Sequence, residues 1–226
     1  MTHSGYIFLA FAFLLSSCVR STSDSIAEDI NPHYRHIDDY TLDAQMHLVK
    51  DIPASFNEKL VNVVIEIPTG TIDKWEVNKD SGDLEWEIKS GVPRVIDYLG
   101  YPGNYGFIPQ TVLAKEDGGD GDPLDVLVLG LPVERGSIVQ AEIIGVLTLL
   151  DRGEQDDKLI AVAENTTFSN IQSLTEMEKK YPGVIDVVST WFANYKGDGL
   201  IQITGTAEKA EALKILEQAK ASFTKQ

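Results

Sequence analysis

Hydrophobic positions after residue 47 first come in short runs separated by Gly, Pro, Asn and Asp, which is the pattern of β-strands joined by turns. The predicted strands are Leu60–Ile67, Lys74–Val77, Leu84–Ile88, Arg94–Leu99, Val126–Leu129, Ile138–Leu150 and Lys158–Ala163. The last third changes to helical spacing, which predicts amphipathic helices over 184–195 and 212–223, the second with Thr206 as its N-cap. Strands followed by helices, without regular βαβ alternation, predict an α+β fold on an antiparallel sheet or small barrel.

One apolar run stands apart near the N-terminus. Tyr6–Leu15 reads YIFLAFAFLL, which is too short to cross a bilayer but suits the hydrophobic region of a signal peptide. The run ends in Leu15-Ser16-Ser17-Cys18, which resembles the bacterial lipoprotein box, where cleavage precedes a lipid-bearing cysteine. The alternative is a buried strand with an incidental cysteine. We expect cleavage after residue 17 and lipidation of Cys18.

This interpretation sets the domain organisation. Residues 1–17 are expected to be the lipoprotein signal peptide, 18–47 a lipid-anchored polar tether, and 48–226 the folded domain. The expected location is the bacterial cell envelope, on the periplasmic side, with the lipid anchor as the only membrane attachment. Val19 after the cysteine favours the outer membrane.

Composition narrows the chemistry of the folded part. The chain carries 35 acidic and 19 basic residues, a net charge of −16, which excludes nonspecific binding of nucleic acid. Its one cysteine is Cys18, and its four histidines all precede residue 50, so the rest can build neither a His-dependent nucleophile system nor a zinc site of Cys or His ligands. Carboxylates are hard ligands that suit Mg²⁺, Mn²⁺ or Ca²⁺, so if the folded part is an enzyme, a metal-assisted one is expected.

An acidic motif precedes the strand at 126–129. Residues 117–125 read DGGDGDPLD and place Asp120, Asp122 and Asp125 close together. Two such charges about 4 Å apart repel by about 4 kcal/mol at an effective dielectric of 20, which a bound cation removes. A solvated acidic turn is one alternative. An EF-hand loop needs an acid or Asn where Leu124 stands, and a glycine-aspartate calcium repeat needs Asp where Pro123 stands.

Further candidate groups flank this motif, and each alone also fits a solvated turn, a surface strand or simple packing. They are Asp151, Asp156 and Asp157 around one turn, Glu66, Lys74 and Glu76 in IEIPTGTIDKWEVNK, Tyr101 and Tyr105 in YPGNYGFIP, and the pair Tyr195-Lys196.

Taken in order and spacing, these segments resemble the family I soluble inorganic pyrophosphatases over roughly residues 48–224. The resemblance implies a five-stranded OB-like β-barrel with additional strands and flanking α-helices. It implies hydrolysis of inorganic diphosphate to two phosphates with Mg²⁺, by a homo-oligomer.

The resemblance also implies roles for single residues. Asp122 would accept the proton of the attacking water. The metal ligands would be Asp120, Asp125, Asp151 and Asp156, with Glu66 and Glu76 supporting further ions. The substrate contacts would be Lys74, Arg94, Tyr105, Lys158, Tyr195 and Lys196. Pro93 stands where compact bacterial members carry arginine, so Arg94 is preferred over Lys89.

Two other functions remain open at this point. One is a noncatalytic lipoprotein of the same fold that binds a divalent cation or phosphate. The other is a hydrolase of a different phosphoanhydride, such as polyphosphate or a nucleotide. Turnover and a panel of substrates separate these functions from diphosphate hydrolysis.

Overall fold

The computed structural model describes residue 1, residues 32–114, residue 119 and residues 121–225. The expected signal peptide, Cys18 and the first part of the tether fall almost entirely outside the described residues, as does Asp120. None of the helices in the described ranges combines the length and apolar character of a membrane span. The statements below concern the described residues.

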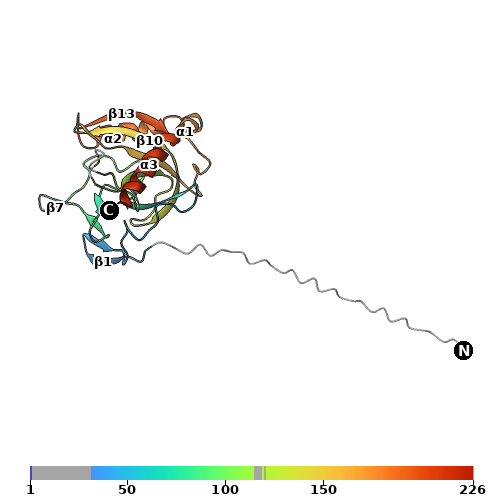
Figure 1. Ribbon diagram of the computed structural model, residues 1–226, viewed down its shortest axis with the longest axis horizontal. Helices are drawn as coiled ribbons and strands as arrows, with labels where there is room; N and C mark the ends of the chain where they lie inside the picture. Colours follow the sequence, from blue (N-terminus) through green and yellow to red (C-terminus); the bar gives the residue numbers. More distant parts are fainter. Residues whose placement is uncertain (2–31, 115–118, 120, 226) are drawn as a thin grey trace.

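A closed barrel forms the centre of the molecule (Figure 1). Its five strands, in order around the barrel, are β3 (Val61–Ile67), β8 (Asn104–Ile108), β9 (Leu124–Leu129), β12 (Lys158–Ala163) and β10 (Ile138–Asp151). Strand β10 closes the ring by pairing with β3, and only β9 and β12 run parallel. The α+β class and the OB-like barrel with additional strands and flanking helices are therefore confirmed.

Smaller elements surround the barrel. A four-stranded sheet contains β1 (Arg35–Asp38), β2 (Thr41–Asp43), β5 (Leu84–Trp86) and β4 (Trp75–Val77). Strands β6 (Ile88–Lys89) and β7 (Val92–Pro93) form a short hairpin, while β11 (Glu154–Gln155) and β13 (Ile201–Glu208) pair with β10. The helices are α1 (Leu174–Lys180), α2 (Val184–Asn194) and α3 (Lys209–Phe223). Figure 1 shows β1 at the opposite end of the molecule from α1, α2 and β13.

Strand alternation places most apolar side chains of the barrel in two clusters, and Val64, Phe107 and Ile138 pack in a third. Val126 and Val128 of β9 pack in the cluster that α3 covers with Ala212, Leu216 and Ala219. Leu127 and Leu129 pack in the opposite cluster, which α1 and α2 cover with Met177, Trp191 and Phe192. The barrel strands are thus buried on both faces, which explains their nearly continuous apolar sequences.

Four sequence expectations differ from the structure. The tether was expected to extend to residue 47, but β1 and β2 are folded, Leu42 is buried and the Tyr34 hydroxyl donates to Gly136 O at 2.9 Å. The domain therefore begins before residue 48. This segment has too few apolar residues for β1 and β2 to show the alternating apolar pattern that predicts a strand.

The other differences concern local pairing. Residues 94–99 form no strand; they lie beside residues 72–74 through single hydrogen bonds such as Ile96 N to Ile72 O, 2.8 Å. The run 84–88 divides at Glu87 into β5 and β6. Thr206 pairs with Leu147 inside β13, so Glu208 is the N-cap of α3.

Candidate active site

All predicted site residues in the described ranges except Glu66 line one polar cavity of about 440 Å³. Its lining includes the side chains of Lys74, Glu76, Arg94, Tyr105, Asp122, Asp125, Asp151, Asp156, Lys158, Tyr195 and Lys196. A second polar cavity of about 200 Å³ shares five of these side chains and adds Glu66. Residues more than 100 positions apart in the sequence therefore face the same space, although their roles stay predictions.

The parallel pair β9 and β12 positions the centre of the cavity. Leu159 lies opposite Val126 in the register, so the preceding residues, Lys158 and Asp125, lie side by side where the two strands begin. The Lys158 amine, which is 3% exposed as a residue, forms ion pairs with the carboxylates of Asp125 and Asp156. Burial disfavours the ammonium form, but the two carboxylates outweigh burial and raise the pKa of Lys158. Lys158 therefore stays charged at neutral pH.

A β-bulge places Glu66 at the cavity. In the pairing of β3 with β8, Ile65 lies opposite Gly106 and Ile67 opposite Tyr105, which leaves Glu66 as the extra residue. Its Oε1 accepts the Val77 N–H at 2.7 Å, and burial raises the pKa of Glu66 to about 8. A bound cation would favour the ionised form of such a carboxylate.

Gly106 makes the bulge possible because any side chain there would collide with β3. A Cβ at this position would lie 1.8 Å from Val64 O. The two strands therefore approach closely beside Glu66 and Tyr105.

Two more ion pairs line the cavity. Lys196, just after α2, lies 2.7 Å from Asp151 at the end of β10, and Lys74 lies 2.7 Å from Glu76. The other oxygen of Asp151, Oδ1, is buried with no hydrogen-bond partner in the described structure; the Arg152 guanidinium is 3.6 Å away.

Aromatic rings form the wall that carries the phenols. Trp191 stacks on Tyr195 with centroids 4.5 Å apart, and Tyr101 lies 5.1 Å from Tyr105. Burial raises the pKa of Tyr195 to about 12 and that of Tyr105 well above its ordinary value. Both phenols are therefore neutral hydrogen-bond donors at physiological pH.

Of the two candidates for the upstream cation, Arg94 lines the cavity, whereas Lys89 lies on the exposed strand β6. The Arg94 guanidinium pairs with Glu87 at 2.5 Å. Sequence reasoning missed Glu154 and Gln155, which also line the cavity, and Lys79, whose amine pairs with the Asp122 carboxylate. Only the position of Lys79 in the same run as Lys74 and Glu76 could have indicated it.

The donor chemistry fits a hard divalent cation. Every candidate ligand is a carboxylate, and the unpartnered Asp151 oxygen is one of them. Among the described residues, no three acidic, His or Cys side chains converge into a metal-binding cluster, and Asp120 lies outside this part of the chain. Lys158 and Lys196 pair with the carboxylates instead.

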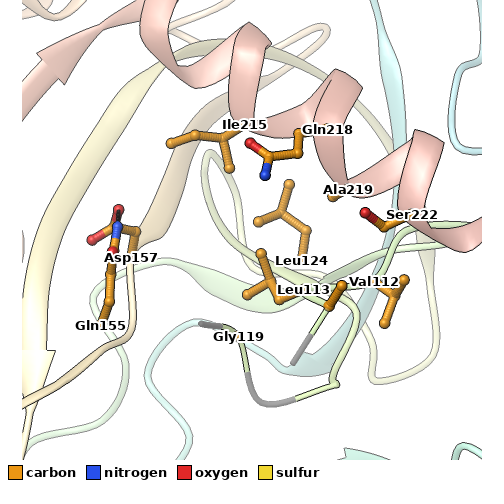
Figure 2. A pocket seen from close by; sticks show the side chains of 11 residues that line it. Val112, Leu113, Gly119, Leu124, Gln155, Asp157, Ile215, Gln218, Ala219 and Ser222 are labelled. Carbon is orange, nitrogen blue, oxygen red and sulfur yellow. Dashed lines mark hydrogen bonds between the residues drawn. The ribbon is translucent and has the colours of Figure 1, made fainter. Parts of the chain in front are cut away.

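A smaller, mostly apolar cavity of about 130 Å³ lies next to the polar one. Figure 2 shows Ile215, Gln218 and Ala219 of α3 facing Leu113 and Leu124. Gly119 and Gln155 line both cavities. None of the described residues that line the apolar cavity is a lysine or arginine.

Comparison with known proteins agrees with this geometry. The sequence profile of the family "Inorganic pyrophosphatase" matches residues 63–224. The inorganic pyrophosphatase of Gluconobacter oxydans is 39% identical over 183 residues, covering 76% of this chain and 94% of that protein. The mitochondrial inorganic pyrophosphatase of Saccharomyces cerevisiae is 37% identical over 65% of this chain, which spans about half of that longer relative, 54%.

A solved structure shares the fold as well. The type I inorganic pyrophosphatase from Toxoplasma gondii superimposes with a TM-score of 0.76 at 27% identity, covering 81% of this chain and 91% of that one. The family profile, the bacterial relative and the fold agree with one another. This chain therefore belongs to the inorganic pyrophosphatase family.

Proposed function

We propose that this chain hydrolyses inorganic diphosphate to two phosphates, with Mg²⁺ as its metal. The observation that carries this proposal is the single cavity in which carboxylates, buried ammonium groups and neutral phenols face one another. Diphosphate is a small, highly charged anion that repels nucleophiles. Its hydrolysis requires charge neutralisation together with a base, and the cavity offers side chains for both.

The family is metal-dependent, and the carboxylates supply the ligands. Asp125, Asp151 and Asp156, together with Asp120, would hold the principal ions, and Glu66 and Glu76 would support them. When bound, Mg²⁺ neutralises phosphoryl oxygens and acidifies coordinated water. The side-chain oxygens that face the cavity suit Mg²⁺ better than softer metals, which prefer sulfur or imidazole.

The other proposed roles, accepting a proton and binding the substrate, belong to side chains that line the cavity. Asp122 is half-exposed at the cavity and would accept the proton of the attacking water. Lys74, Arg94, Lys158 and Lys196 would neutralise and hold the two phosphoryl groups. Tyr105 and Tyr195 would donate hydrogen bonds from neutral hydroxyls, because their pKa values are raised.

A substrate panel tests this function against its two alternatives. Phosphate release by the full chain with Mg²⁺ is measured for diphosphate, tripolyphosphate and ATP. We expect rapid release from diphosphate and at least 100-fold slower release from the other two. Binding of diphosphate without release would favour a noncatalytic protein, and preference for a longer substrate would favour a different phosphoanhydride hydrolase.

Asp122→Asn supplies the matched inactive variant for the same assay. Removing a general base costs about 10²–10⁴-fold in rate, so we expect kcat for diphosphate to fall within that range. Asp122 is half-exposed, so the thermal unfolding midpoint should change little. Full activity in this variant would refute the assignment of the base.

We further propose that the enzyme is held in the bacterial cell envelope by lipid on Cys18. The support is the ten-residue apolar run followed by Leu15-Ser16-Ser17-Cys18. Cys18→Ala should release the protein from the membrane fraction, and unchanged fractionation would refute lipidation.

We also propose that the protein is a homo-oligomer. Light scattering of the purified chain tests this directly, and a monomer would refute it.

A further inference from the structure

A lysine outside the predicted set lies against the proposed base. Lys79 follows β4, and its amine donates to Oδ1 of Asp122. Both side chains are half-exposed, and both line the 200 Å³ cavity together with Glu66 and Asp125. We propose that Lys79 is a positioning residue that holds the Asp122 carboxylate toward the cavity; this inference rests on the proposed function.

The turn that carries Lys79 is fixed by its own hydrogen bonds. The Asn78 side chain accepts the N–H groups of Asp80 and Ser81 at 3.0 and 3.3 Å. The Gly82 N–H donates to Asn78 O at 2.7 Å, and the Asn78 N–H donates to Asp83 O at 2.8 Å. These bonds close a compact turn between β4 and β5. Lys79 therefore projects from a defined backbone.

The N-terminal segment fixes the turn to the body of the domain. The Leu48 N–H donates to Gly82 O at 3.2 Å, and Leu48 itself is fully buried. Gly82 has a φ of +83°, and a Cβ there would lie 2.5 Å from His47 Cα and 2.7 Å from the His47 ring. Only glycine allows this approach without displacing the turn.

Positioning matters more here than the strength of the ion pair. A half-exposed ion pair adds little to folding stability because solvent screens its charges. A base displaced by about 1 Å can cost up to about 100-fold in rate, because proton transfer depends on alignment. The consequence of losing Lys79 should therefore appear in kcat, with little effect on the unfolding midpoint.

Lys79→Met and Lys79→Arg test this role directly. With diphosphate and saturating Mg²⁺, we expect Lys79→Met to lower kcat about tenfold, KM to change less than twofold, and Lys79→Arg to recover most of the rate. A raised KM with unchanged kcat would overturn the proposal, because Lys79 would then bind substrate. Unchanged kcat and KM would overturn it too. Turnover by the unmodified chain shows separately that the proposed function stands.

A second pair of variants tests the turn itself. Gly82→Ala must displace the turn, whereas Gly183→Ala has the same φ of +83° but no atom within 4 Å of the new Cβ. Both carry the backbone strain, so Gly183→Ala is the matched control. We expect kcat of Gly82→Ala to be at least fivefold lower than kcat of Gly183→Ala. In a double variant that also carries Lys79→Met, Gly82→Ala should lower kcat little further. Equal kcat values for the two glycine variants would overturn the proposal. So would a double variant of Gly82→Ala and Lys79→Met whose loss of kcat equals the product of the two single losses.

Discussion

The two neighbouring cavities differ in chemistry although the same strands and turns line both. Leu124 and Asp125 are consecutive residues of β9, yet Leu124 faces the apolar cavity and Asp125 the polar one. Before β12, Asp156 lines the polar cavity, and Asp157 lines the apolar one. Successive residues of extended chain point to opposite sides, so one barrel wall separates the two environments. A shift of one residue in register would exchange the chemistry of the two cavities.

Among the changes to either cavity, removing the metal from the polar one should have the largest effect on phosphate release. The proposed ligands that the structure describes line the two polar cavities and not the apolar one, so chelation with EDTA should abolish phosphate release and added Mg²⁺ should restore it. Full activity in metal-free buffer would contradict the proposal.

Replacing the buried cation of the polar cavity should have the next largest effect. Lys158→Met removes the charge between Asp125 and Asp156 while keeping much of the side-chain volume. We expect at least a 100-fold loss of kcat/KM for diphosphate, because a buried charge-assisted contact is lost. Steady-state kinetics measure the loss. A change below threefold would remove Lys158 from the proposed substrate contacts.

A smaller loss is expected from Tyr195→Phe, which removes one hydroxyl but leaves the ring stacked on Trp191. A hydrogen bond to a charged group contributes about 1.5–3 kcal/mol, so kcat/KM should fall roughly 10- to 100-fold. The raised pKa, about 12, keeps the phenol protonated below that pH. The ratio of wild-type to variant rates should therefore be constant from pH 7 to 9. A ratio that changes across this range would contradict a neutral donor.

The smallest effect on activity is expected from a core substitution in α3, the helix that lines the apolar cavity. Leu216 of α3 is 3% exposed and packs in the cluster that α3 covers. Leu216→Ala should lower the free energy of unfolding by about 2–5 kcal/mol, measured by urea denaturation, through lost burial and a new cavity. We expect kcat to stay within twofold where the variant is folded. A large loss of kcat in the folded variant would show that α3 takes part in the site.

Four of the five barrel strands could be predicted from the sequence because burial on both faces makes them apolar runs, whereas β8, which reads NYGFI, was not predicted as a strand. Lys158–Ala163 matches its prediction in full, and Ile138–Leu150 differs by one residue. Weakly apolar segments were harder. Strands β1 and β2 were assigned to the tether, because only scattered residues such as Leu42 are buried there. Strand β2 pairs with β5, which is distant in the sequence, and β1 pairs, among the described strands, only with β2, so both depend on a tertiary contact.

The site could be predicted where its residues belong to a compact motif and not where geometry alone brings them in. Asp122 and Asp125 were recognisable from their spacing next to a strand. Lys79 was not, because its neighbour Asp122 lies 43 positions away and the turn depends on the packing of Gly82 on His47. The bulge that places Glu66 likewise depends on the register of β3 with β8.

The adjacent acids Asp156 and Asp157 provide the most direct test that the polar cavity is the catalytic one. Asp157 lines the apolar cavity and accepts the Leu149 N–H at 3.1 Å and a Gln155 side-chain N–H at 2.8 Å. The decisive measurement is kcat for Mg²⁺-dependent diphosphate hydrolysis by Asp156→Asn and Asp157→Asn, side by side. We predict at least a 100-fold loss for Asp156→Asn and less than threefold for Asp157→Asn. Equal losses, or a larger loss for Asp157→Asn, would contradict the account.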